Sequence, residues 1–442
     1  MLTKTFRGGV SLTECKELTV DRKIRPVPAP PEIVLPLSQH IGSPNQPIVK
    51  EGDMVKVGQR VGEAKAFISA PVHSPVSGKI KAIRNVLNPV YGKRPALIIE
   101  NDGKYESVPM VKRDSGDRLS KDELINIIKE AGLVGLGGAA FPTHVKLNVP
   151  KDKNVDSLII NGAECEPYLT CDHRLMVEST GHILRGIYLA AGILGVKNIF
   201  LAIEENKLSA IFAMEKAARR MNKKLPHAQI RLIMLKTKYP QGGEKQLIKA
   251  VLKREVPPGK FPMDVGVVVH NVGTCLAIYE AVDAGKPLIE RPVTFTGSAL
   301  KEPGNFMVRF GTSIGHVARH CGGFKENPVK IIAGGPMMGL AQYTLDAPLT
   351  KGISGVVFLS KKDAEIPEEF PCIRCAKCVD VCPVNLMPTE LMRMVKYSRW
   401  YNSSALYPAD CIECGACAYV CPSKIPLVQY IKLAKEKELQ EK

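Results

Sequence analysis

The C-terminal part of the chain contains one cysteine pattern twice, and this repeat decides how the rest of the sequence is interpreted. The first copy is Cys372-Ile-Arg-Cys375-Ala-Lys-Cys378-Val-Asp-Val-Cys382-Pro383, and the second is Cys411-Ile-Glu-Cys414-Gly-Ala-Cys417-Ala-Tyr-Val-Cys421-Pro422. Each copy has three cysteines at every third position and a fourth cysteine next to a proline. A short loop with this spacing can wrap three thiolates around three corners of a metal cluster.

This spacing indicates iron–sulfur clusters rather than zinc. In the run C-x2-C-x2-C-x3-C-P, the fourth cysteine binds the cluster of the other run. We therefore expect two [4Fe–4S] clusters that pass single electrons, the first held by Cys372, Cys375, Cys378 and Cys421 and the second by Cys411, Cys414, Cys417 and Cys382. Zinc, the alternative, usually takes well-separated C-x2-C pairs, often with histidine, and no histidine follows His320. Residues 388–401 have helical apolar spacing, which predicts a largely helical cluster domain.

Composition describes a globular chain with redox chemistry. At roughly 150 residues per domain, 442 residues make about three domains, and 45% hydrophobic residues exclude disorder as the main state. We expect no membrane-spanning segment and no secretory signal, because no apolar stretch is long enough and the N-terminus lacks an apolar region. Thirteen cysteines then indicate metal or redox work rather than disulfides. The net charge of +17 is dispersed, which favours an acidic redox protein or a membrane surface over nucleic acid as the partner.

Helical and strand patterns alternate between about residues 118 and 285. They predict strands at 158–161, 199–203, 230–235 and 265–269, and helices at 175–194, 207–221 and 244–252. An earlier helix begins at a capping box of Ser120 and Glu123. The alternation predicts a mostly parallel sheet covered by helices, with ligands beyond the carboxyl ends of its strands.

A glycine loop follows that first helix. It reads Gly135-Leu-Gly137-Gly138-Ala-Ala-Phe141-Pro-Thr143, with Lys146 shortly after it. Bare backbone N–H groups of such a loop can cradle a phosphate. The alternative is a tight structural loop, since a dinucleotide fingerprint normally follows a strand. Polar segments at 161–167, 239–244 and 270–274 each follow a strand and are either capped turns or, with the glycine loop, one site.

Together these segments resemble the flavin- and NADH-binding subunit of respiratory complex I and its hydrogenase relatives. The matching positions are Phe141-Pro-Thr143 with Lys146, then Asn161, Glu164 and Glu166, then Tyr239, Gly242 and Glu244, and finally Asn271 with Thr274. The resemblance implies that FMN is held by Gly135, Gly137, Gly138, Lys146, Asn161, Glu164, Asn271 and Thr274, and that the NADH pocket is shaped by Phe141, Glu166 and Glu244. Departures from the complex I pattern occur at Leu136, Ala163, Gly243 and His270.

Two cluster runs, instead of the one four-iron cluster of the complex I protein, resemble the C subunit of the Rnf electron transport complex. The stretches Phe6-Arg-Gly8-Gly9 and Leu35-Pro-Leu-Ser-Gln-His40 are also similar, so the resemblance covers essentially the whole chain. It implies the NADH-facing subunit of a membrane-bound, ion-translocating ferredoxin:NAD oxidoreductase, peripheral on the cytoplasmic side of the cell membrane. Its partners would be the membrane subunits, a ferredoxin-linked redox chain and NADH, and no catalytic side chain is needed because FMN carries the chemistry.

Two alternatives belong to other functional classes. One is a soluble flavin and iron–sulfur cobalamin reductase, which the N-terminal Gly8-Gly9 stretch disfavours. The other is a non-catalytic electron-wire subunit with a vestigial nucleotide pocket, for which the departures at Ala163 and Gly243 are the support.

The expected fold is therefore α/β and multidomain. Residues 47–83 resemble a lipoyl-type barrel sandwich, in which Phe67 occupies the position of the modified lysine, so neither lipoylation nor biotinylation is expected. Residues 293–340 resemble the β-grasp module of the complex I family. The expected domains are 1–110 (barrel sandwich), 111–285 (FMN and NADH), 286–355 (β-grasp) and 356–442 (two clusters). Among the remaining cysteines, Cys15, Cys275 and Cys321 are expected in the core, and Cys165 and Cys171 beside the flavin loop.

Overall fold

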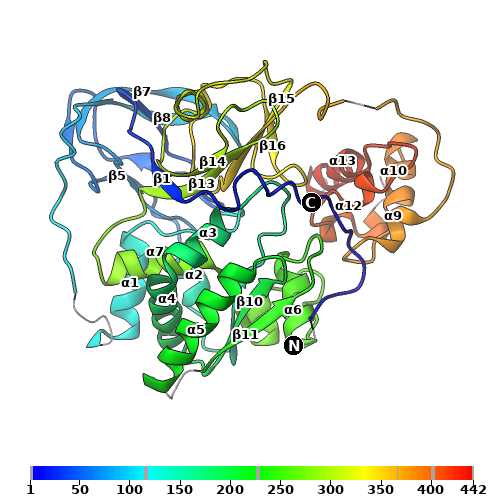
Figure 1. Cartoon of the computed structure of the whole chain (residues 1–442), viewed down its shortest axis with the longest axis horizontal. Helices are drawn as coiled ribbons and strands as arrows, with labels where there is room; N and C mark the ends of the chain where they lie inside the picture. Colours follow the sequence, from blue (N-terminus) through cyan, green and yellow to red (C-terminus); the bar gives the residue numbers. More distant parts are fainter. Residues whose placement is uncertain (1–2, 114–117, 225–228, 366, 400–403, 441–442) are drawn as a thin grey trace.

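A computed structural model describes residues 3–113, 118–224, 229–365, 367–399 and 404–440. The flavin-domain helices and their parallel sheet lie below two antiparallel and mixed sheet regions, and the C-terminal helices form a separate lobe to one side (Figure 1). The N-terminal segment, dark blue in the figure, runs between the parallel-sheet domain and that lobe. None of the helices in the described ranges is long and apolar enough to cross a membrane.

The parallel sheet predicted from the alternating pattern is confirmed. Its four strands lie in the order β11 (Gln229–Leu235), β10 (Asn198–Glu204), β9 (Ser157–Gly162) and β12 (Val267–Asn271), and all neighbours are parallel. Each strand lies within two residues of its predicted limits. The strands are nearly continuous apolar runs because helices cover both faces of the sheet.

The helices of this domain are α1 (Lys121–Glu130), α2 (Thr143–Leu147), α3 (Cys171–Glu178), α4 (Thr180–Leu194), α5 (Leu208–Lys224), α6 (Glu244–Leu252) and α7 (Val272–Val282), with a 3-10 turn, η2 (Pro262–Val265). The capping box of Ser120 and Glu123 is present at the start of α1. The single helix predicted over 175–194 is wrong in its extent. It is divided at Ser179, and α3 begins earlier because the Glu164 carboxylate accepts the backbone N–H groups of Asp172 and His173.

Helices α4 and α7 pack closely through a glycine. A Cβ on Gly186 would lie 1.7 Å from the carbonyl oxygen of Cys275, so only glycine allows this approach. Cys275 and Cys321 are fully buried, as predicted for core residues. Cys15 is only half-buried, so its assignment to the core is wrong. It lies in the N-terminal segment that runs over the surface of the parallel-sheet domain.

The remaining sheets belong to the barrel sandwich and the β-grasp region. The barrel sandwich contains β2 (Glu32–Pro36), β8 (Gly92–Asn101), β7 (Gly78–Asn88) and β4 (Met54–Val55) in one sheet, and β3 (Gln46–Pro47), β5 (Arg60–Glu63) and β6 (Val72–His73) in another. The β-grasp region has a mixed sheet in the order β1 (Ile24–Pro26), β14 (Gly304–Arg309), β13 (Glu290–Thr296), β17 (Gly355–Leu359), β15 (Lys330–Ala333) and β16 (Leu340–Gln342), with helix α8 (Ile314–His320). Strands β1 and β17 extend this sheet beyond residues 286–355.

The C-terminal lobe is helical, as predicted. It contains α9 (Lys377–Asp380), α10 (Pro388–Lys396), α12 (Ala416–Tyr419) and α13 (Leu427–Gln440), with short 3-10 turns η3 (Ser404–Leu406) and η4 (Pro408–Asp410). The helix expected over 388–401 ends at Lys396, and positions 400 and 401 lie outside the described residues. Each short helix, α9 or α12, follows the first two cysteines of one run.

Candidate functional site

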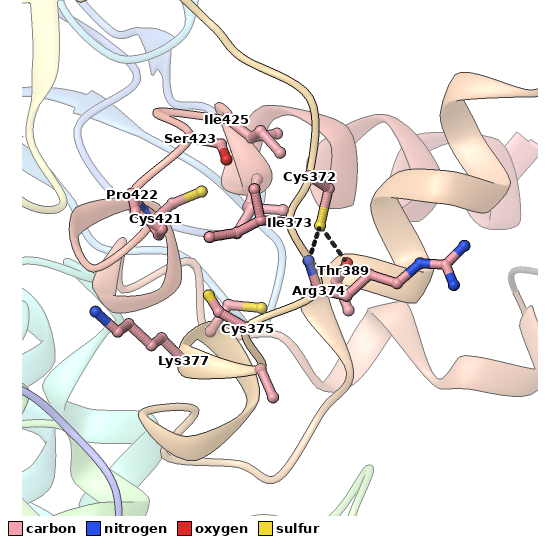
Figure 2. A pocket seen from close by; sticks show the side chains of 13 residues that line it. Cys372, Ile373, Arg374, Cys375, Lys377, Thr389, Cys421, Pro422, Ser423 and Ile425 are labelled. Carbon is pink, nitrogen blue, oxygen red and sulfur yellow. Dashed lines mark hydrogen bonds between the residues drawn. The ribbon is translucent and has the colours of Figure 1, made fainter.

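The eight cysteines of the two runs form two groups of four. One pocket is lined by Cys372, Cys375 and Cys378 together with Cys421 of the other run, and a second is lined by Cys411, Cys414 and Cys417 together with Cys382. Figure 2 shows the sulfurs of Cys372, Cys375 and Cys421 pointing toward a common space. Four thiols converging twice is the donor set that a pair of [4Fe–4S] clusters requires, so the residues fit that cofactor.

The two loops reach this geometry through the same backbone conformation. Left-handed conformations occur at Arg374 and Ala376 in the first run and at the equivalent Glu413 and Gly415 in the second. These turns bring the three cysteines of each run to one side of the loop. They also direct backbone N–H groups at sulfur, from Arg374 to Cys372 Sγ and from Glu413 to Cys411 Sγ, each at 3.4 Å. Such donors favour the thiolate form that binds iron.

The second group lies against the parallel-sheet domain. Tyr239, which follows β11, is 2% exposed and donates its hydroxyl to the carbonyl oxygen of Cys414 at 2.8 Å. Burial raises the pKa of this phenol, which keeps it a hydrogen-bond donor. Gln246 of α6 donates to the carbonyl of Pro383 at 3.2 Å. Both contacts hold the second group of cysteines to the strand ends where the candidate flavin site lies.

The N-terminal segment completes this contact. The N–H of Gly9 donates to the carbonyl of Val381 at 2.8 Å, and Val10 exchanges two backbone hydrogen bonds with Tyr239. A Cβ on Gly8 would lie 3.0 Å from the carbonyl of Cys382, and Gly8 has a positive φ of 82°. The Gly8-Gly9 pair noted in the sequence is therefore needed where the chain passes between the two domains.

The glycine loop lies beside the start of α7. The hydroxyl of Thr274 accepts the N–H of Leu136 at 2.9 Å, and a Cβ on Gly137 would lie 3.5 Å from Cβ of Asn271. Gly138 is exposed, with a φ of 113° and open space where a Cβ would lie. The loop therefore leaves bare backbone open at the edge of the sheet, next to a helix N-terminus, an arrangement that is suited to binding a phosphate.

A buried arginine also holds this loop in place by hydrogen bonds, and no sequence motif identifies this arginine. Arg291 of β13 is 2% exposed and donates from Nη2 to the carbonyl of Leu136 at 3.0 Å and from Nη1 to that of Lys351 at 2.7 Å. Leu136 is thus held at its N–H by Thr274 and at its carbonyl by Arg291. The only signal in the sequence is a basic residue within the segment that forms β13, and it does not identify the partner.

Lys146 and Glu244 contact each other. Lys146 Nζ lies 2.5 Å from Glu244 Oε1 and donates to the carbonyl of Val269 at 3.0 Å. One of these side chains was predicted to hold FMN and the other to shape the NADH pocket, so both predictions concern one place. His270 is buried here, and burial, with the nearby Lys146 charge, lowers its pKa to about 3. Its Nε2 has no hydrogen-bond partner among the described residues.

Asn161 and Glu164 are both engaged by protein groups. Asn161 Nδ2 donates to the carbonyl of Gly242 at 2.9 Å, and Glu164 caps the start of α3. Asp172, which the sequence motifs do not include, is buried and accepts a hydrogen bond from Asn271 at 2.6 Å. Burial and then the charge of Glu164 raise its pKa, and its Oδ1 has no partner within the described ranges.

Together, the bare glycine loop and the unpaired buried atoms of Asp172 and His270 fit a ligand that carries both a phosphate and several hydroxyl groups. FMN is such a ligand.

Glu166 faces the β-grasp region. Its carboxylate accepts the N–H groups of Met337 and Met338 at 3.0 and 2.9 Å. A Cβ on Gly335 would lie 2.3 Å from Glu166 Oε2, so glycine is required there. Burial raises the pKa of Glu166 to about 7. Phe141, the remaining residue predicted for the NADH pocket, is half-buried, and its carbonyl accepts the N–H of Gly135 at 2.8 Å.

Comparison with protein families gives three matches along the chain. Residues 4–104 match the RnfC barrel sandwich hybrid domain, residues 128–280 the Nuo51 FMN-binding domain, and residues 371–425 a 4Fe-4S dicluster domain. Among solved structures, an NAD+-reducing [NiFe]-hydrogenase in the H2-reduced state aligns with a TM-score of 0.52 at 20% identity, over 74% of this chain and 63% of that chain. This likeness concerns the fold alone.

Curated relatives match nearly the whole chain. The C subunit of the proton-translocating ferredoxin:NAD(+) oxidoreductase complex of Clostridium ljungdahlii is 47% identical over 98% of this chain and 94% of its own length. The C subunit of the Na(+)-translocating complex of Acetobacterium woodii is 44% identical, over 98% and 96%. The C subunit of the ion-translocating oxidoreductase complex of Rhodobacter capsulatus is 41% identical, over 98% and 83%. With two cysteine groups, a flavin-type sheet and these relatives, the chain belongs to the RnfC family, whose members are the C subunits of Rnf complexes.

Proposed function

We propose that this chain is the NAD(H)-facing electron-transfer subunit of an ion-translocating ferredoxin:NAD oxidoreductase complex. It would pass electrons between NAD(H), FMN and two [4Fe–4S] clusters. The observation that carries this proposal is the joint between domains: Tyr239, at the end of a strand of the parallel sheet, is hydrogen-bonded to the loop of Cys414. This hydrogen bond links the strand ends, where the ligand would bind, to the loop where the metal group would bind.

The residues at the strand ends have distinct proposed tasks. The FMN phosphate would be held by the glycine loop of Gly135, Gly137 and Gly138, together with Lys146 and the start of α7. The rest of the flavin would be held by Asn161, Glu164, Asn271, Thr274 and the unpaired oxygen of Asp172. Phe141, Glu166 and Glu244 would shape the NADH pocket. When bound, FMN supplies the exchange between hydride transfer and single-electron transfer. The chain's own part is to bind and align.

The two cysteine groups differ in position, and we propose that this sets their order. Cys411, Cys414, Cys417 and Cys382 would hold the inner cluster, next to the flavin domain. Cys372, Cys375, Cys378 and Cys421 would hold the outer cluster. The support is exposure: Cys372 and Cys375 are exposed, whereas Cys414 and Cys417 are buried.

The proposed setting follows the family. The chain would be peripheral on the cytoplasmic side of the cell membrane, bound to the membrane subunits of the complex and linked to ferredoxin, with no nucleic-acid partner. We also propose the four domains at 1–110, 111–285, 286–355 and 356–442 as functional units. The relatives from C. ljungdahlii and A. woodii carry names of ferredoxin:NAD(+) oxidoreductase complexes, which supports this setting.

An anaerobic titration of the FMN- and iron-loaded chain with NADH tests the proposal. Bleaching of the flavin band, followed by bleaching of the broad iron–sulfur absorption, is the expected result. Clusters that dithionite reduces and NADH does not would refute it and favour an electron-wire subunit. Catalytic reduction of a corrinoid by the isolated chain would instead favour a soluble cobalamin reductase.

A further inference from the structure

The two cysteine loops have the same motif but different surroundings. In the second loop, Ala416 is fully buried and Ile412 is half-buried, and both pack in a cluster with Tyr239 and Val10 at the joint with the parallel-sheet domain. The equivalent of Ile412 in the first loop is Ile373, which is 68% exposed. All nine residues from 369 to 377 are exposed. The second loop thus has a docking partner within the chain, and the first loop has an exposed apolar residue at the same position.

The charged residues of the two loops also differ: those of the second loop are paired within the chain, and those of the first loop, within the described ranges, are not. Glu413 in the second loop pairs with Lys435 at 2.6 Å and Lys432 at 3.2 Å. The equivalent residue of the first loop is Arg374, and Lys377 stands where the second loop has Ala416. Neither Arg374 nor Lys377 forms an ion pair with any residue that the structure describes. Figure 2 shows both side chains extending away from the cysteine sulfurs.

The first loop therefore combines three features of a docking surface. Ile373 is exposed beside the pocket of the outer group, Arg374 and Lys377 in the same loop have no ion pair among the described residues, and Cys372 and Cys375 are exposed. Interfaces typically place apolar residues at the centre and charges at the rim, where the charges select a complementary partner. Two cations and no paired carboxylate in the loop select an acidic surface.

We propose that residues 370–377 are the docking loop for another subunit of the same complex, one that has its own one-electron centre within an acidic surface. The inference rests on the proposed function, whose outer cluster would lie under this loop. A permanent subunit is favoured over a soluble carrier because Phe370, in the same loop as Ile373, is also exposed, at 54%. Permanent interfaces are more apolar than those of transient electron carriers.

The test uses the assembled complex with substitutions in this chain alone. Ile373→Asp places a charge at the centre of the loop, and the double variant Arg374→Glu with Lys377→Glu reverses its rim. A double variant at Lys325 and Lys330, both to Glu, is the matched control, because it makes the same change in net charge on exposed residues of the β-grasp region. The readouts are retention of the chain in the complex during gel filtration at rising salt, and ferredoxin:NAD turnover.

We expect each loop variant to weaken retention at least about tenfold, as substitutions at an interface centre or at its complementary charges do, and turnover to fall with retention. The control should match the unchanged complex. Retention equal to the control in both loop variants would overturn the proposal. Normal retention with loss of ferredoxin turnover would also overturn it, because the loop would then serve a soluble carrier. EPR of the NADH-reduced complex separates the two ideas: reduced clusters in the variants show that the proposed function holds, whatever happens at the loop.

Discussion

The joint between the flavin domain and the inner cysteine group includes one buried phenol. Tyr239 is 2% exposed, and its hydroxyl donates to the carbonyl of Cys414 at 2.8 Å. Tyr239→Phe keeps the ring and its packing but leaves a buried carbonyl without a donor. An unsatisfied buried acceptor costs about 1–3 kcal/mol, which corresponds to about a 5- to 150-fold shift in the equilibrium between the docked and released loop. We expect the joint to open more often by this factor, with the overall fold unchanged.

Hydrogen exchange measures this opening directly. The backbone N–H groups of Gly9 and Val10 are donated across the joint, to the carbonyls of Val381 and Tyr239. Their exchange should accelerate in the Phe variant, because exchange there requires local opening. Tyr430→Phe is the control, since the hydroxyl of this half-buried tyrosine on α13 makes no hydrogen bond within the described residues. Equal exchange in the two variants would refute the role of the Tyr239 hydroxyl.

Three further predictions concern the ligand groups. Cys382→Ala should remove the EPR signal of the cluster held mainly by the second run; loss confined to the other cluster would exclude the exchange of fourth ligands. Glu166→Gln should flatten the pH dependence of stability. Burial raises the pKa of this carboxyl from 4.5 to about 7. Between these values the folded protein keeps a proton that the unfolded chain releases, so stability falls as pH rises across that range. Melting temperatures of the two proteins that change in parallel between about pH 5 and about pH 8 would contradict this. Lys146→Ala should lower the FMN retained after gel filtration, measured by fluorescence, and unchanged retention would remove Lys146 from the phosphate site.

Patterns that act locally were readable from the sequence. The cysteine spacing identifies the metal chemistry because three ligands of each cluster must lie within one short loop, and the grouping of Cys421 with the first run follows the same rule. The strands of the parallel sheet were found because burial on both faces makes them continuous apolar runs. The capping box at Ser120 was found because both its partners lie within one turn.

Features that depend on distant partners were not readable. Asp172 and Arg291 have no local motif, and their roles arise only when β13, α3 and the glycine loop meet. The early start of α3 at Cys171 has the same origin, because its cap comes from Glu164, on a segment after β9. When a side chain well outside the helix sets its boundary, the spacing of apolar residues along the helix does not reveal that boundary.

The two cysteine runs show how little sequence is needed to make one motif face inward and the other outward. In the second run, Ala416 lies at the joint with the flavin domain, where it is fully buried and packs in one cluster with Tyr239. The first run has Lys377 at that position, and burying an unpaired ammonium there would cost several kcal/mol. The first run therefore cannot take the inner place, although its cysteine spacing is identical. Because the cysteines specify only the cluster, it is the residues between them that determine which cluster lies next to the flavin domain and which lies at the surface.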